Sequence, residues 1–392
     1  MRVAIIADSH FDESTRFEEC VSIHQWIVND VYDRGVDLVL HAGDVFERAS
    51  TPKERLAVRE WLLDLAITCP VVIVRGNHDA PGDLEFFDRL RGNYPIIVEE
   101  NAGVHHIAGV CIQAMAWPRK ANVLSMLEGV GREAGEAVAG EALRNVLRGL
   151  DHDAYQRGPA YPHLPEPPRI LLAHAMVSGS RTSTGQPLTG CNLELGLQDL
   201  ELAGADFVAL GHIHLGQDWR LSDGTPVVYP GSPRRCTFGE REPKGYVVVD
   251  LDKHGGPVSW EHIDTPCTPM LHIEAHFDGD RMVYLDDSHD VEVDAAEVRF
   301  RYHTAPEHRE AARERADRAA SRWLSVGAIH VKLEEVVEVA QRARAPEVAA
   351  AQGIGPKLRA YWRAKDDVPE EPRAVRLVGG AAEVEEEVRH AV

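Results

Sequence analysis

The 392-residue sequence lacks three features: closely spaced cysteine pairs, a hydrophobic run long enough to cross a bilayer, and an excess of positive charge. Its six cysteines are widely spread with no CxxC pair, so we expect free thiols in a reducing compartment. No apolar run approaches the ~20 residues that span a bilayer. The first residues read as a strand rather than as a signal peptide. We therefore expect a cytoplasmic protein without membrane contact.

The formal net charge is −21, which argues against non-specific binding to nucleic acid or to anionic membranes. A DNA substrate would need a specific feature to outweigh this charge. The length predicts two domains, and a 44% hydrophobic content is enough for a sizeable core.

Five short aliphatic runs in the first two-thirds of the chain each end abruptly in a polar cluster. The runs are continuous rather than alternating, which is typical of strands buried on both faces. Helical patterns over 17–31 and 56–65 separate the first runs. This order predicts an α/β layered fold, in which ligands bind beyond the carboxyl ends of the strands. The runs are 3–7, 36–40, 71–74, 170–173 and 207–210.

The polar clusters contain carboxylate, amide and imidazole groups. A carboxylate can bridge two cations, whereas each imidazole offers one lone pair. Mixed oxygen and nitrogen ligands without thiolate suit Mn²⁺, Fe²⁺ or Zn²⁺ better than Mg²⁺. Two such cations can hold a phosphate and activate a water. Each cluster is weak alone, but together they predict a two-metal phosphoesterase. The clusters are Asp8-Ser9-His10, His41-Ala42-Gly43-Asp44, Gly76-Asn77-His78-Asp79, His174 and Gly211-His212-Ile213-His214.

In this order the clusters resemble the five blocks of the calcineurin-like metallophosphoesterases. The resemblance implies a four-layer αββα sandwich with a dinuclear metal site at one end of the sheets. The implied ligands are Asp8, His10 and His214 for one metal, Asn77, His174 and His212 for the other, and Asp44 as the bridge.

The same resemblance gives His78 a different duty, which is to stabilise or protonate the leaving oxygen. Asp79 follows it directly and would either orient His78 or hold a turn. For the other histidines, the sequence does not predict a direct role in catalysis or metal binding. His41 could support the ligands from behind, His24 lies on an apolar helix face, and the pair at 105–106 is expected in a surface turn.

The stretch 229–246 resembles the block that closes the catalytic domain of SbcD nuclease subunits, and 298–333 resembles their β-α-β DNA-capping domain. The implied domains are a nuclease domain at 1–268, a capping domain at 269–343, and partner-binding helices with an acidic tail at 344–392. Residues 121–168 read as an insertion with a helix near 136–150 and a proline-rich connector.

By this resemblance the chain is a DNA nuclease that uses two metal ions, with manganese the usual metal and Mg²⁺, Fe²⁺ or Zn²⁺ as alternatives. It would act as a 3′-to-5′ exonuclease on duplex ends and as an endonuclease on single strands or hairpins. The implied partners are an SbcC-type coiled-coil ATPase and a second copy of the chain. Candidate anchors for the ATPase, which could equally pack on their own domain, are Leu358, Tyr361 and Trp362.

A local basic cluster could offset the acidic charge near the expected site, because phosphate contacts need only a local field. Arg234 and Arg235 are the candidate DNA contacts. We still expect the isolated chain to bind DNA poorly. The supporting positions are Arg241 and Lys244 nearby, and Arg299, Arg301 and Arg309 in the expected cap.

Two other functions are open. A small-molecule phosphoesterase would use the same metal site, but it predicts an isolated compact domain without the extra C-terminal segments. A catalytically silent scaffold for an ATPase would not require the complete ligand set together with His78.

Overall fold

The computed structural model describes residues 1–118, 135–156, 166–183, 193–252, 258–285, 292–338, 346–365, 369–371 and 373–380. The chain forms two compact units. One is Met1–Glu274 with Asp286–Phe300 and Arg318–Leu333, and the other is Ala275–Leu285 with Arg301–Asp317 and Glu334–Val392. The expected domain boundaries after 268 and 343 do not follow this division and stay a prediction. The connector prolines at 159, 162 and 165 and the acidic tail beyond 380 lie outside the described residues.

The first sheet of the larger unit has the strand order β14-β13-β1-β2-β3-β4. Strands β1 to β4 run parallel, and β13 and β14 continue the sheet antiparallel at the β1 edge. Helices α1 (Phe17–Asp33) and α2 (Pro52–Thr68) supply the apolar faces that cover it. The strands are β1 (Arg2–Ile6), β2 (Leu38–His41), β3 (Val71–Val74), β4 (Ile96–Glu99), β13 (Gly245–Asp250) and β14 (Ser259–Asp264).

The second sheet has the order β11-β12-β10-β7-β6-β5, with a parallel centre and antiparallel strands at both edges. Helices α4 (Gly135–Gln156) and α5 (Leu197–Leu200) belong to this side, and α4 contains the helix expected near 136–150. The strands are β5 (Ala102–Ile107), β6 (Val110–Met115), β7 (Arg169–His174), β10 (Phe207–Gly211), β11 (Gln217–Arg220) and β12 (Pro226–Tyr229), and a small pair is β8 (Met176–Val177) with β9 (Glu194–Leu195).

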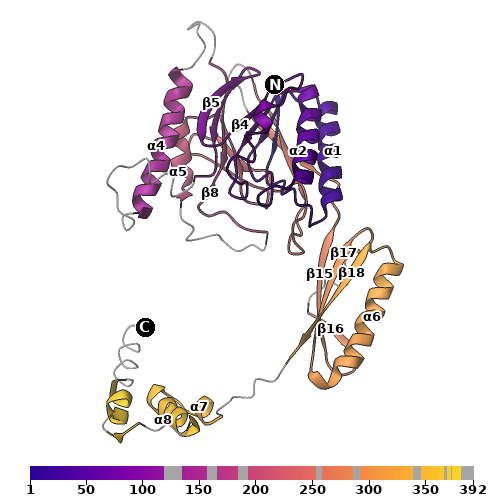
Figure 1. Cartoon of the computed structure of the whole chain (residues 1–392), viewed down its shortest axis with the longest axis vertical. Helices are drawn as coiled ribbons and strands as arrows, with labels where there is room; N and C mark the ends of the chain where they lie inside the picture. The colour runs from indigo at the N-terminus through magenta and orange to yellow at the C-terminus, as the bar shows by residue number, and fades with distance from the viewer. Residues whose placement is uncertain are drawn as a thin grey trace. The chain divides into compact units, whose positions relative to one another are not determined.

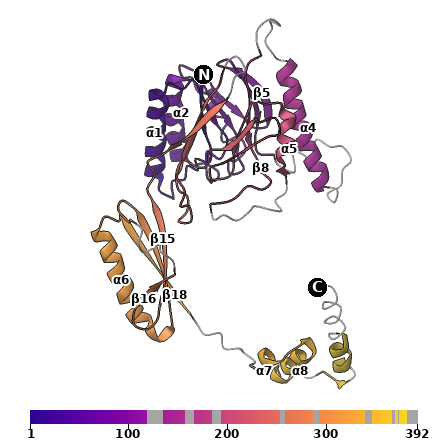
Figure 2. The same cartoon turned by 180° about the vertical axis from the view of Figure 1, so that it is seen from behind.

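Side chains of the central strands alternate between two apolar cores. Ala4 and Ile6 of β1 pack in the core beneath α1 and α2, whereas Val3 and Ile5 pack between the two sheets. Both faces are thus buried, which explains why the runs in the sequence are continuous rather than alternating. Figures 1 and 2 show α1 and α2 on one side of the paired sheets and α4 and α5 on the other. The expected four-layer αββα sandwich is confirmed.

The start of α2 also holds a loop of the site. Thr51 and Glu54 form a capping box, in which the Thr51 hydroxyl accepts the Glu54 N–H at 3.3 Å and the Glu54 carboxylate accepts the Thr51 N–H at 2.8 Å. The other Glu54 oxygen accepts the backbone N–H of Glu13 at 2.8 Å. One buried carboxylate therefore ties the loop after β1 to the helix that follows β2.

A four-stranded sheet with the order β16-β15-β17-β18 lies later in the chain. The buried side chains of β17 alternate along the strand, and Phe300 meets Trp323 of α6 with ring centroids 5.0 Å apart. The expected strand–helix–strand order is present. Among the described residues, no helix is long and apolar enough to span a membrane. The elements are β15 (Met270–Phe277), β16 (Met282–Tyr284), β17 (Glu297–Thr304), α6 (Arg309–Ser325), β18 (His330–Val337), α7 (Pro346–Ala350) and α8 (Ile354–Lys365).

Candidate metal centre

Loops from the carboxyl ends of both sheets meet at one edge of the sandwich. The Asp8 and His10 N–H groups donate to the carbonyls of Gly43 and Asp44 at 3.0 and 3.1 Å, which locks the first two loops together. Two motif glycines allow this close approach. A Cβ added at Gly76 would lie 2.0 Å from the Asp44 carboxylate, and one at Gly211 would lie 2.1 Å from the Ala42 carbonyl oxygen. Gly76 and Gly211 are therefore required for close packing of the loops, because any side chain there would collide with a neighbouring loop.

The first group of candidate ligands is Asp8, His10 and His214, whose donor atoms lie within 4.8 Å of one another. The Nε2 atoms of the two histidines face each other at 3.0 Å. Their Nδ1 atoms point at carboxylates, since His10 Nδ1 is 2.7 Å from Glu47 and His214 Nδ1 is 3.4 Å from Glu240. Because carboxylates lie beside both Nδ1 atoms, the two facing Nε2 atoms are the nitrogens left to bind a cation once the proton between them is released. Such a pair fits a bound cation.

The second group consists of Asn77, His174 and His212. The Asn77 Oδ1 atom is 2.9 Å from both His174 Nε2 and His212 Nδ1. The Ala42 carbonyl lies 2.7 Å from His174 Nδ1 and fixes the proton there, which leaves Nε2 free for a cation. Trp117 packs against the rings of His212 and His174, with centroids 4.8 and 5.7 Å apart.

Asp44 lies between the two groups. Its Oδ2 atom is 3.4 Å from His174 Nε2 and 3.9 Å from His10 Nε2, as a bridging carboxylate requires. The seven expected ligands are therefore brought together, and their oxygen and imidazole donors fit two divalent cations. Four of them hold unusual backbone angles, with φ of 54° at Asp8, 46° at His10, 55° at Asp44 and 115° at His212. Strain of this kind clusters at functional sites.

Without a metal, the buried cluster retains protons. Burial disfavours the charged imidazole of His174, but the Asp44 carboxylate outweighs it and raises the His174 pKa to about 9. Burial likewise opposes protonation of His214, yet Cys236 and Glu240 hold its pKa well above the usual value. The Asp44 carboxyl keeps a pKa well below its usual range despite burial, because His174 lies against it.

Metal binding must displace these protons. At pH 7 to 8 the metal-free His174 is protonated, since its pKa is about 9, so Mn²⁺ affinity should fall as the pH falls. Each proton released costs about tenfold in affinity per pH unit. We expect calorimetric titrations with Mn²⁺ in buffers of different ionisation enthalpy to show proton release and at least this slope. An affinity that does not change between pH 7 and 8 would contradict the ligand role of His174.

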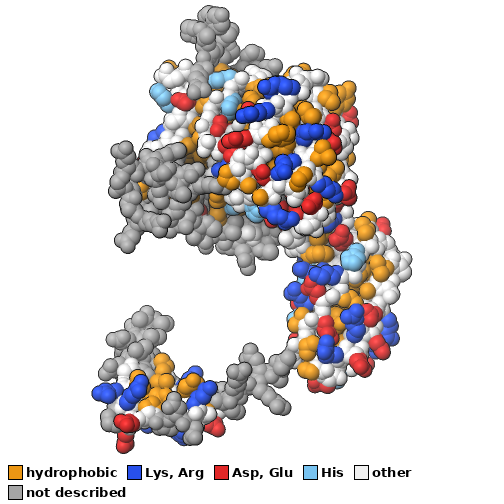
Figure 3. All heavy atoms as spheres, viewed as in Figure 1, with side chains coloured by type: hydrophobic (Ala, Val, Ile, Leu, Met, Phe, Trp, Pro, Cys, Tyr) orange, Lys and Arg blue, Asp and Glu red, His pale blue; other side chains and the backbone are white. Residues whose placement is uncertain are grey.

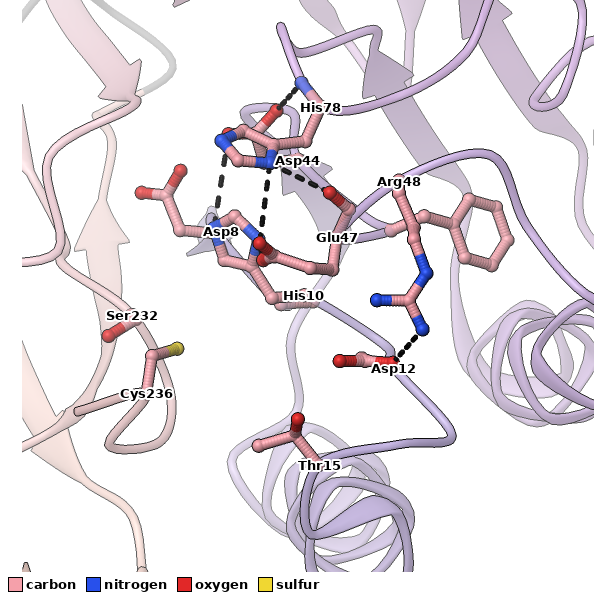
Figure 4. A network of polar contacts seen from close by, with 12 residues as sticks. Asp8, His10, Asp12, Thr15, Asp44, Glu47, Arg48, His78, Ser232 and Cys236 are labelled. Carbon is pink, nitrogen blue, oxygen red and sulfur yellow. Dashed lines mark hydrogen bonds and ion pairs between the residues drawn. The ribbon is translucent and has the colours of Figure 1, made fainter.

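His78 lies beside the ligands without joining either group. Its backbone N–H donates to Asp44 Oδ1 at 2.8 Å, and its ring Nδ1 donates to the Glu47 carbonyl at 2.8 Å (Figure 4). The ring is 39% exposed and borders a cavity of about 390 Å³ that also reaches His10 and His214. Its Nε2 is the nitrogen left for a substrate.

The His78 ring contacts Glu47 rather than Asp79, so the structure does not support the catalytic role expected for Asp79. The two oxygens of Asp79 instead accept the backbone N–H groups of Phe46 at 2.9 Å and Gly76 at 2.8 Å. Burial, with the nearby Asp44 charge, raises the pKa of this carboxyl to about 6. Asp79 therefore joins the loops after β2 and β3, which is the turn-holding alternative.

A buried chain of hydrogen bonds supports the ligands from behind. Gly43 N–H donates to His41 Nδ1 at 3.2 Å, so His41 Nε2 donates to the Ser9 hydroxyl at 2.8 Å. Ser9 in turn donates to His24 Nε2 at 2.8 Å, and His24 Nδ1 donates to the Cys20 carbonyl. Burial lowers the pKa of both histidines to about 3, so they stay neutral. His41 therefore supports the ligand loops from behind, as expected, and His24 belongs to the same hydrogen-bond chain.

The expected basic cluster is largely internal. Arg234 is 2% exposed and donates to the His10 carbonyl at 2.6 Å, so it supports the ligand loop from within rather than contacting DNA. Lys244 is buried and paired with Glu240 at 2.8 Å. Arg235 donates to the carbonyls of Glu240 and Glu242, both at 3.0 Å, and its contact with DNA stays a prediction.

Further arginines expected to add positive charge are also paired with acidic groups. Arg301 meets Glu334 at 3.1 Å, and Arg309 meets Glu335 at 2.7 Å. Arg299 instead lies over the Phe238 ring at 5.0 Å. The positive field expected from the cap is therefore reduced.

Candidate partner residues lie on α8. Tyr361 is 50% exposed, whereas Leu358 and Trp362 are half-buried, so their role in docking stays a prediction. His105 does not lie in the expected surface turn, because it is part of strand β5 and pairs with Glu99 at 3.1 Å. Three residues beside the ligands are not predicted by the sequence pattern, namely Glu47, Glu240 and Trp117. Of these three, only Glu47 could have been identified from the sequence, because it lies three residues after Asp44 at the same strand end.

Several known proteins are similar to this chain. Two relatives are a subunit of the nuclease SbcCD from Bacillus subtilis, 26% identical over 67% of this chain and 69% of that protein, and its namesake from Escherichia coli, 24% identical over 69% and 70%. A solved dimetal phosphatase from Danio rerio covers 68% of this chain and 97% of its own, with 12% identity and a TM-score of 0.40. The profile of the calcineurin-like phosphoesterases matches residues 1–216, which span the ligand clusters. The chain belongs to the calcineurin-like phosphoesterase family.

Proposed function

We propose that this chain is a manganese-dependent DNA nuclease and the nuclease subunit of an SbcCD-like complex. The observation that carries the proposal is the convergence of seven ligand side chains beside His78, which lines one cavity together with the ligands His10 and His214. A purely structural metal site would not need an additional imidazole with a free nitrogen at its edge.

The chain's own residues divide the work of hydrolysis. When bound, two divalent cations would hold the phosphodiester and lower the pKa of a water. The two ligand groups and the bridging Asp44 would place those cations. His78 lines the cavity, and its imidazolium form would donate the Nε2 proton to the leaving oxygen as the phosphorus–oxygen bond breaks. Asp44 accepts the His78 N–H and so joins the acid to the ligands.

DNA is favoured over a small phosphodiester for two reasons. Both relatives are named as nuclease subunits, and their likeness extends over two-thirds of the chain. The chain also continues beyond the sandwich with the four-stranded sheet, α6 and α8, which a small-molecule esterase would not need. A silent scaffold is disfavoured because the ligand set and His78 are complete.

An ATPase partner would supply DNA affinity that this chain lacks. On the face of the larger unit that Figure 3 shows, Lys and Arg side chains are interspersed with Asp and Glu. Together with the net charge of −21, this pattern offers little non-specific attraction to phosphate. We propose an SbcC-type coiled-coil ATPase docked on α8, and a homodimer.

One assay tests the proposal. The purified chain is incubated with Mn²⁺ and a linear duplex, a hairpin or a generic phosphodiester, and the products are resolved on a gel. We expect cleavage of both DNAs, removal of nucleotides in the 3′-to-5′ direction from duplex ends, and weak DNA binding without the partner. Cleavage of the generic diester alone would favour the small-molecule alternative.

A further inference from the structure

We propose that Glu47 is a positioning residue that fixes two histidines at once, the metal ligand His10 and the acid His78. This inference rests on the proposed function. The Glu47 carboxylate lies 2.7 Å from His10 Nδ1 through Oε2 and 3.7 Å from His78 Nδ1 through Oε1. Its backbone carbonyl accepts from the same His78 nitrogen at 2.8 Å (Figure 4). The Nδ1 atoms of His10 and His78 are therefore both in contact with Glu47.

The chemistry of these acceptors decides the protonation of both rings. The carbonyl can only accept, so neutral His78 carries its proton on Nδ1. The carboxylate 2.7 Å from His10 Nδ1 favours the proton on that nitrogen of His10 as well. His10 then directs the Nε2 lone pair toward His214, and the carboxylate behind the ring strengthens it as a donor to a cation. In His78, the nitrogen facing the substrate is left as Nε2. One residue thus leaves Nε2 of His10 to hold a cation and Nε2 of His78 as the second nitrogen, through which only the imidazolium, protonated on both nitrogens, can donate to the leaving oxygen.

The backbone around Glu47 is well held, whereas its side chain is accessible. The preceding Phe46 N–H is bound by Asp79 at 2.9 Å, and the Glu47 N–H reaches the Phe11 carbonyl at 3.4 Å. The Glu47 side chain is 41% exposed, but the His10 side chain is only 3% exposed. Replacing Glu47 therefore removes the partner of a buried ring without leaving a buried cavity, and the fold should tolerate it.

The His10 part is tested by Mn²⁺ affinity, measured by calorimetry on the purified chain. Glu47→Ala should bind Mn²⁺ about 10- to 100-fold more weakly than the wild type. Glu47→Gln keeps an oxygen that can accept the His10 proton and should stay close to the wild type. Glu13→Ala removes the same charge from an exposed position in the neighbouring loop and serves as the control. Unchanged affinity in Glu47→Ala, or equal weakening in Glu47→Gln, would overturn the assignment.

The His78 part is read from cleavage at saturating Mn²⁺ and from ring nitrogen spectra. Glu47→Ala should lose more activity on an oligonucleotide than on bis(p-nitrophenyl) phosphate, whose leaving group needs no proton. Nitrogen-15 spectra should place the proton of neutral His78 on Nδ1 in the wild type and in Glu47→Ala, because the backbone carbonyl is retained. The loss of activity would then come from the missing carboxylate 3.7 Å from the ring, which helps to orient it, and not from a changed tautomer. Equal losses on both substrates, or a proton on Nε2, would overturn this part. A wild-type chain inactive on DNA would remove the proposed function but leave the Mn²⁺ comparison intact.

Discussion

Replacing His78 with alanine should lower DNA cleavage by about 10²- to 10⁴-fold, the usual contribution of a positioned acid or base. The variant should keep its full complement of Mn²⁺, because the His78 ring belongs to neither ligand group and contacts Asp44 only through the backbone N–H. The measurement is single-turnover cleavage of a linear duplex, with metal content determined by atomic absorption.

Two comparisons make the His78 experiment specific. His105→Ala removes a histidine of β5 that pairs with Glu99, and it should leave cleavage unchanged. A diester with a p-nitrophenolate leaving group should be affected far less than DNA by His78→Ala. Full activity on DNA would show that His78 does not serve the leaving group, and loss of metal would show that it acts as a ligand.

Replacing Asp79 with alanine should lower the free energy of unfolding by about 2–6 kcal/mol, since two buried N–H groups lose their acceptor at about 1–3 kcal/mol each. Asp79 is fully buried, and its partners Phe46 and Gly76 lie in the loops that carry Asp44 and Asn77. The measurement is urea denaturation of the metal-free chain monitored by circular dichroism.

The matched variants separate structure from catalysis. Asp79→Asn keeps one acceptor and should lose less stability than Asp79→Ala. Glu60→Ala changes an exposed carboxylate of α2 and should have little effect. If Asp79→Ala were as stable as the wild type but inactive, the carboxylate would act on His78 as its place in the sequence indicates, and the structural role would be wrong.

Placement of the ligands could be predicted from the sequence because the strand pattern and the ligand positions coincide. Asp8, Asp44 and His174 each stand at or just after the end of a continuous apolar run, and parallel strand ends share an edge. The four-layer arrangement was less accessible, since a continuous run shows that both faces are buried but not what covers them. The four layers are implied only by the resemblance to the calcineurin-like metallophosphoesterases.

Hydrogen-bond partners could not be predicted, because adjacency in the sequence does not give side-chain direction. Asp79 follows His78 directly but turns toward Phe46 and Gly76, whereas Glu47, 31 residues away, meets the His78 ring. The predicted surface exposure of Arg234 was wrong for a similar reason. Arg234 reads as a surface charge in a basic stretch, yet it lies 2% exposed beneath the His10 loop.

Mn²⁺-dependent cleavage of a linear DNA duplex by the purified chain tests the central proposal most directly. A variant with His10 and His214 both changed to alanine, which removes the facing Nε2 pair, provides the metal-site control. We predict cleavage that requires Mn²⁺, is abolished by chelation and is lost in this variant. Cleavage that persists in the chelator, or the absence of any phosphodiester hydrolysis with Mn²⁺, would contradict the assignment of this site as a two-metal nuclease centre.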